Sequence, residues 1–114
     1  MTGDCIFCKV IAGTIPAARV YDDEQCIAFT DVNPQAPHHV LVVPKVHVTS
    51  LAFTTAKDQE LLGHLMVAAN EVARQQGLEH GYRVVVNTGP DGGQTVSHLH
   101  LHVMGGRHMG WPPG

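Results

Sequence analysis

The sequence predicts an α+β fold: an antiparallel five-stranded sheet with one long helix and one short helix, in a single domain covering residues 1–114. Three strand-like segments precede a long helical segment, and two more follow it. The connections between them are short, which favours antiparallel neighbours. A chain of this length has room for one small hydrophobic core, so we expect no second domain.

The first three predicted strands cover residues 19–21, 26–31 and 39–44. The first two, RVY and CIAFTD, are rich in β-branched and aromatic residues and flank the polar sequence DDEQ, which indicates a tight turn. The sequence NPQAP at 33–37 is a loop, because its prolines fix φ and remove backbone donors. The run HVLVVP is typical of a strand that is buried on both faces.

A long amphipathic helix is predicted from Asp58 to Gln76. Asp58 is placed to help cap its start, and Gly77 is placed to end it in a left-handed conformation. A shorter helical turn is expected to begin at Thr49 or Ser50. The apolar positions of the long helix recur at spacings of three and four: Leu61, Leu62, Leu65, Met66, Ala69, Val72 and Ala73.

The last two predicted strands cover residues 82–88 and 95–104. The glycine-rich turn NTGPDGGQ joins them. The tail GGRHMGWPPG contains too much glycine and proline to form a helix. The sheet is therefore completed by a hairpin after the long helix.

The composition excludes several classes of protein. Ten acidic residues outnumber seven lysines and arginines, so the formal net charge of -3 gives no basic surface for a nucleic acid polymer. The sequence has no signal segment and no apolar run long enough to span a membrane, so we expect a cytoplasmic protein without a membrane partner. Three cysteines, two of them three positions apart, do not indicate a disulfide framework.

Three of the nine histidines alternate with apolar residues: His98, His100 and His102. Residues two apart share a face on a strand but not on a helix, so these side chains can act together only if the segment is extended. The intervening side chains then point to the core: Leu99, Leu101 and Val103.

Three interpretations of this pattern compete. It could be a solvent-facing polar stripe, a site where two neighbouring imidazoles chelate zinc, or a nucleophilic site where a neutral imidazole attacks phosphorus. The preceding turn supplies glycine N–H groups and the neutral side chains of Asn87, Gln94 and Thr95, a combination that suits phosphate. Taken alone the turn is more simply a hairpin turn, but beside the histidines it favours the nucleophilic interpretation.

A resemblance to a known family covers nearly the whole chain. The segment SHLHLHV resembles the histidine triad signature. Further segments are similar, in order, to those of the histidine triad nucleotide-binding branch, the purine nucleoside phosphoramidases: CIFCKVIAGTIPA, FTDVNPQAPHHVLVVPKVHV, LLGHLM, GYRVVVNTGPDGGQTVSHLHLHVMGGR and the terminal WPPG. The resemblance implies a HIT-like fold for residues 1–114.

The resemblance also implies an enzyme that hydrolyses the P–N bond of purine nucleoside 5'-phosphoramidates, such as AMP-NH2 or AMP-lysine. His100 matches the nucleophile that forms a covalent nucleotidyl intermediate. His102 and His39 match positions that orient it, and His98 would orient or protonate near the leaving group. No metal is expected to take part in the reaction.

Nucleotide-binding positions follow from the same resemblance. Asp31 matches the carboxylate that contacts the ribose hydroxyls, and Trp111 resembles a tail residue that reaches the active site across a dimer. The expected phosphate-binding positions are Asn87, Gly93 and Thr95. The expected base-pocket candidates are Ile27, Phe29, Ile11 and Phe7.

Cys5 and Cys8 form a Cys-x-x-Cys pair that alone is half a zinc site. In the family, chains with this pair often add two histidines, which here match His47 and His98. A structural zinc ion is expected, and His98 would then serve the strand and not proton transfer. Cys26 lies in an apolar strand and is interpreted as a small buried residue.

The family commonly forms a two-fold homodimer, and we expect one here. Two other functions stay open at this point: a nucleotide-binding regulatory or scaffold protein with incidental hydrolysis, and a non-enzymic tris-histidine metal protein. The presence of His100 favours the enzyme, because a protein that only binds nucleotides needs no nucleophile.

Overall fold

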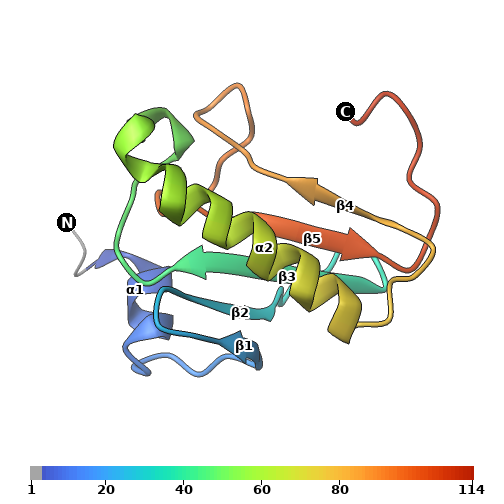
Figure 1. Ribbon diagram of the computed structural model, residues 1–114, viewed down its shortest axis with the longest axis horizontal. Coiled ribbons are helices and arrows are strands. Elements are labelled where there is room, and N and C mark those ends of the chain that lie inside the picture. Colours follow the sequence, from blue (N-terminus) through green and yellow to red (C-terminus); the bar gives the residue numbers. More distant parts are fainter. Residues whose placement is uncertain (1–3) are drawn as a thin grey trace.

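The computed structural model describes residues 4–114, so the first three residues of the predicted domain lie outside the described range. It contains one five-stranded antiparallel sheet in the order β1-β2-β3-β5-β4, crossed on one face by α2 (Figure 1). The predicted fold class is therefore confirmed. The elements are α1 (Ile6–Ile11), β1 (Arg19–Asp22), β2 (Cys26–Thr30), β3 (His38–Pro44), the 3-10 turns Leu51–Phe53 and Ala56–Asp58, α2 (Gln59–Gln75), β4 (Tyr82–Val85) and β5 (Leu101–Gly105).

Strand β3 is the centre of the sheet and is buried on both faces, as its apolar sequence predicts. Its register with β5 places Leu41 opposite His102 and His39 opposite Met104. Directly paired residues and residues two apart share a face, so His39 lies diagonally across from His102 on one face. The pairing of two non-adjacent strands thus brings two distant histidines together.

The two faces of the sheet have different cores. On one face α2 packs against β3 and β5, and the buried residues of this core are Cys26, Ala28, Val40, Val42, Leu65, Ala68, Ala69, Val72, Ala73, Leu78, Leu99, Leu101 and Val103. On the other face α1 packs beneath the sheet, with the buried residues Phe7, Val10, Ile27, Phe29, Leu41 and Val43. The histidines lie on this second face.

The long helix begins one residue later than predicted and does not use the predicted cap. The Asp58 side chain makes no capping bond to α2. Its carboxylate instead accepts a hydrogen bond from the Thr55 backbone N at 2.8 Å, which closes a capping box on the preceding 3-10 turn. Gly77 ends α2 with φ +74°, as expected. Within residues 4–114, no helix combines the length and apolar character needed to cross a bilayer.

Helix α1 was not predicted. It has six residues, two of them isoleucine and one valine, so neither its length nor its helical propensity distinguishes it in the sequence. Cys5 is its N-cap, and the Cys5 Sγ accepts from the Cys8 backbone N at 3.4 Å. Its buried residues, Phe7 and Val10, hold it against the sheet. The Cys-x-x-Cys pair therefore lies at the start of a helix.

The predicted strand 95–104 is wrong in its first six residues, because β5 begins only at Leu101. The register of β3 and β5 would pair Leu99 with Pro44, which has no N–H to donate. The Pro44 carbonyl instead faces the His98 ring, at 2.9 Å, and the Leu99 N–H donates to the Val48 carbonyl. Since β4 pairs with β5, the predicted strand 82–88 is likewise shortened to Tyr82–Val85.

We predict that Leu65→Ala lowers the free energy of unfolding by about 2 to 5 kcal/mol, because Leu65 is fully buried between α2 and the sheet. Val67→Ala on the same helix, where 70% of Val67 is exposed, should change it by less than about 0.5 kcal/mol. Urea denaturation followed by circular dichroism measures both. Equal losses in the two variants would contradict this description of the core.

Candidate functional site

His100 is buried, and one of its ring nitrogens is hydrogen-bonded to the backbone. It is 4% exposed, and its Nδ1 lies 2.7 Å from the His98 carbonyl oxygen. A carbonyl oxygen only accepts, so Nδ1 carries the proton and Nε2 carries the lone pair. The Phe7 ring packs edge-on against His100 with the ring centroids 5.1 Å apart. His100 therefore presents a nucleophilic nitrogen in a fixed orientation.

His102 and His39 form a pair beside His100. The His39 Nε2 lies 2.9 Å from the His102 Nδ1, and the His100 and His102 ring centroids are 5.0 Å apart. Asp31, just after β2, places Oδ2 3.4 Å from the His39 Nε2. The structure thus brings together three of the predicted catalytic histidines and the predicted ribose carboxylate.

Burial determines the charge of this pair. Desolvation lowers the pKa of His102 to about 4, with further lowering from His100 and His39 and opposition from Asp31. Desolvation also lowers the pKa of His39, again opposed by Asp31. Both rings are therefore neutral at pH 7. Since His98 and His100 are nearly inaccessible, the interpretation as a solvent-facing stripe is wrong.

A cavity of about 460 Å³ opens beside these side chains between β2 and α1. It is mostly apolar, with a few polar groups at one side, which is the usual composition of a small-molecule site. The predicted residues that line it are His100, His102, Asp31, Thr95, Phe29 and Phe7. The site therefore combines an apolar wall with a carboxylate, a hydroxyl and two imidazoles.

Other predicted residues do not line this cavity. Ile27 is 0% exposed and belongs to the core, so its expected place in a base pocket is wrong. Ile11 only packs against the second core. Asn87 and Gly93 lie in the turn before the histidines, where the Asn87 Nδ2 donates to the Gly92 carbonyl at 2.7 Å and Gly93 has φ +76°.

Trp111 also lies apart from the cavity of its own chain. It is 85% exposed and sits in the C-terminal tail, against a separate hollow beside β4 and β5. Arg83 on β4 holds this tail, since its Nη2 donates to the Gly110 carbonyl at 2.6 Å. Within one chain, Trp111 is therefore not positioned to contact a ligand in the cavity.

Sequence reasoning missed several cavity residues: Val10, Ile15, Leu41 and Val96. Leu41 lies opposite His102, so pairing of the two strands could have identified it. Val10 lies on α1, a helix that no pattern in the sequence predicts. The wall of the cavity therefore depends on the element that was hardest to predict.

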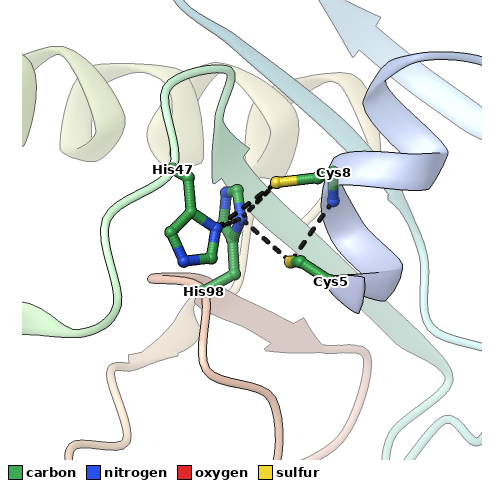
Figure 2. A group of neighbouring side chains, drawn as sticks. All are labelled: Cys5, Cys8, His47 and His98. Carbon is green, nitrogen blue, oxygen red and sulfur yellow. Dashed lines mark hydrogen bonds between the residues drawn. The ribbon is translucent and has the colours of Figure 1, made fainter. Parts of the chain in front are cut away.

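The predicted zinc ligands converge at a second cluster, made of Cys5, Cys8, His47 and His98 (Figure 2). The Cys5 Sγ lies 3.4 Å from the His98 Nδ1, and the Cys8 Sγ lies 3.3 Å from the His47 Nδ1. The two Nδ1 atoms are 3.1 Å apart. Tetrahedral zinc with bonds of 2.0–2.3 Å separates its ligand atoms by about 3.3 to 3.8 Å. The sulfur–nitrogen distances lie in this range and the nitrogen–nitrogen distance is slightly shorter, so the four residues fit this ion after a small shift of the two rings.

His98 is committed to this cluster. Its Nε2 lies 2.9 Å from the Pro44 carbonyl, so Nε2 carries the proton and the Nδ1 lone pair faces the cysteines. Burial lowers the pKa of His98, which keeps the ring neutral and able to bind a metal. His98 does not line the cavity. Of the two roles that the sequence suggested for it, the geometry matches that of a metal ligand.

A third cluster joins the β1–β2 turn to α2. The Asp23 Oδ2 lies 2.7 Å from the His64 Nε2 and accepts from the Tyr21 hydroxyl at 2.9 Å, while Oδ1 accepts from the backbone N of Gln25 and Cys26. The carboxylate is thus surrounded by donors and fixes the turn. Cys26 is fully buried, as expected, and burial raises the pKa of its thiol to about 12.

The sequence also matches known proteins along its whole length. The HIT domain family matches residues 12–109. An uncharacterized HIT-like protein from Synechococcus elongatus is 55% identical over 114 residues, which is 100% of both chains. A 14 kDa zinc-binding protein from Zea mays is 53% identical over 111 residues, covering 96% of this chain and 87% of the relative.

Solved structures agree in fold. A HIT family hydrolase from Legionella pneumophila superposes with a TM-score of 0.95 at 46% identity, covering 97% of this chain and all of that one. A histidine triad nucleotide-binding protein from Candida albicans superposes with a TM-score of 0.82 at 29% identity, covering 96% and 83%. By the match over residues 12–109 and by these relatives, the chain, in which His100 and His102 line one cavity, belongs to the HIT domain family.

Proposed function

We propose that this protein hydrolyses the P–N bond of purine nucleoside 5'-phosphoramidates through a covalent nucleotide on His100. The observation that carries the proposal is the tautomer of His100, whose Nδ1–H is held by the His98 carbonyl so that Nε2 keeps its lone pair. Two similar proteins of known structure, described as a HIT family hydrolase and a histidine triad nucleotide-binding protein, support a hydrolase that acts on nucleotides.

The reaction would proceed in two displacements. The His100 Nε2 attacks phosphorus and forms a P–N bond to the ring, while the bond to the leaving amine breaks and the amine takes a proton from solvent. Water then attacks the same phosphorus and gives a proton to solvent, the bond between phosphorus and His100 breaks, and the nucleoside 5'-monophosphate leaves. Two easier steps replace one difficult step, and each uses a nitrogen that is a good nucleophile and a good leaving group.

The cavity supplies the binding groups for this substrate. The Asp31 carboxylate would accept hydrogen bonds from the ribose hydroxyls, and Phe7 and Phe29 would contact the base. The Thr95 hydroxyl would donate to a phosphoryl oxygen or the leaving group. The Asn87 side chain would contribute by holding the turn that carries the backbone donors around Gly93.

The Cys5, Cys8, His47 and His98 cluster would hold a structural zinc ion. When bound, zinc supplies four-fold coordination that ties the N-terminal helix to the segments before β5 and after β3. The displacement at phosphorus uses the imidazole of His100 and needs no metal. The zinc-binding maize relative supports this proposal.

We further propose a two-fold homodimer in which Trp111 of each chain contacts the partner's cavity. The sheet order leaves β4, with the exposed Tyr82, at an edge, and α2 carries the exposed apolar side chains Met66 and Val67. An uncovered sheet edge with apolar neighbours favours association with a second chain. A dimer would also explain why Trp111 is exposed in a single chain.

His100→Ala is expected to lower kcat/KM for adenosine 5'-phosphoramidate by at least about a thousandfold, as in other enzymes that lose their nucleophile. Mass spectrometry after brief mixing should detect a nucleotidyl adduct on the wild-type peptide that contains His100. His108→Ala, an exposed tail histidine, serves as the control and should keep both adduct and rate. Nucleotide binding with an unchanged rate in His100→Ala would favour the regulatory or scaffold function.

The His102 imidazole is expected to titrate with a midpoint near pH 4, because burial and the neighbouring rings of His100 and His39 disfavour its charge. Between pH 4 and about 6.5 the unfolded chain binds a proton here that the folded chain does not, so stability should fall as the pH is lowered through this window. NMR of the Cε1–H resonance measures the midpoint, with free histidine as reference. A midpoint near 6.5 would contradict the neutral pair.

Zinc is expected at about one ion per chain in wild-type protein, and the double variant Cys5→Ser, Cys8→Ser should lose it. Chelation should lower the melting temperature while the folded fraction keeps its hydrolytic rate. Elemental analysis measures the zinc content, calorimetry measures the melting temperature, and a hydrolysis assay measures the rate. Cys26→Ala, which alters the cysteine outside the cluster, should keep the zinc, and loss of zinc there would argue against this ligand set.

A further inference from the structure

The tautomer of His39 is set by a backbone amide. The His39 Nδ1 lies 2.9 Å from the backbone N of Gln35. A backbone N–H only donates, so Nδ1 must carry the lone pair and the neutral ring must carry its proton on Nε2. His39 is 4% exposed, so water does not compete freely for these positions. The loop before β3 therefore decides which His39 nitrogen is the donor.

The tautomer of His39 in turn determines the tautomer of His102. The Nε2–H of His39 points to the His102 Nδ1 at 2.9 Å, while the Asp31 Oδ2 is farther away at 3.4 Å. When His102 accepts at Nδ1, its own proton must lie on Nε2. His102 lines the cavity, so its Nε2–H is available to a bound phosphoryl oxygen. A displaced amide at Gln35 would remove the constraint on both rings.

The loop that carries Gln35 is also bound by Arg107, which follows β5. The Arg107 Nη2 donates to the Gln35 carbonyl at 3.1 Å, and its Nη1 donates to the His108 carbonyl at 3.3 Å. Gly106 lets the chain approach this closely, because it has φ +94° and an added Cβ would lie 2.9 Å from the Pro37 Cβ. The residues that follow β5 therefore clamp the loop against the start of β3.

We propose that Arg107 is a positioning residue for the hydrolysis proposed above: by holding the Gln35 carbonyl it keeps the backbone N–H of the same residue in place, and this N–H fixes the His39 tautomer and, through it, the nitrogen on which His102 carries its proton. Arg107 itself is exposed at the end of β5 and touches no reacting atom. The expected effect of Arg107 on the rate of hydrolysis rests on the proposed function. The link between Arg107 and the His39 ring is a property of the folded chain alone.

The first experiment is NMR of protein labelled with 15N in its histidines, at pH 7. Wild-type His39 is expected as the neutral Nε2–H tautomer. Arg107→Met should give a mixture of tautomers at His39 and His102, and Arg107→Lys, which keeps a cationic donor, should restore part of the wild-type signal. Arg74→Met, which removes an exposed arginine paired with Glu71 on α2, should leave both rings unchanged.

The second experiment measures hydrolysis of adenosine 5'-phosphoramidate by the same proteins. Arg107→Met should lower kcat by about tenfold with little change in KM, the loss expected for one charge-assisted hydrogen bond. Arg107→Lys should recover part of the rate.

The two experiments separate the proposals. An unchanged His39 tautomer in Arg107→Met overturns the positioning role, and so does a changed tautomer with an unchanged rate. Absence of hydrolysis by the wild-type protein overturns the proposed function. The NMR comparison then still decides whether Arg107 sets the tautomer.

Discussion

The site depends on backbone groups that hold buried imidazoles in one tautomer, because a carbonyl accepts only from a ring N–H and a backbone N–H donates only to a ring lone pair. The Pro44 carbonyl takes the proton of His98, and the His98 carbonyl takes the proton of His100. The backbone N–H of Gln35 donates to the lone pair on the His39 Nδ1. Backbone groups thus fix three rings without a side-chain carboxylate.

Neighbouring residues of the histidine segment serve different parts of the molecule. Alternation along the segment before and within β5 sends Leu99, Leu101 and Val103 into the core beneath α2. The histidines between them face α1 and the cavity. Along this segment, changes to Leu99, Leu101 or Val103 are therefore expected to alter folding, while changes to His100 or His102 are expected to alter the cavity, even though the residues are neighbours in sequence.

The sequence predicted the elements whose pattern is long and regular. The period of α2 and the apolar run of β3 were enough to place both elements, since their burial follows from residue type alone. Six-residue α1 lacked such a pattern, and the early start expected for β5 ignored the competition of the His98 ring for the Pro44 carbonyl. The contacts of Gln35 use backbone atoms, which carry no signature in a sequence.

His98 contributes to two different sites with two different parts of the residue. Its side chain faces the cysteines, whereas its carbonyl accepts the proton of His100. Every amino acid has a backbone carbonyl. A substitution at position 98 would therefore remove one side chain from the cluster with Cys5, Cys8 and His47, while the carbonyl that accepts the His100 proton would stay in the chain.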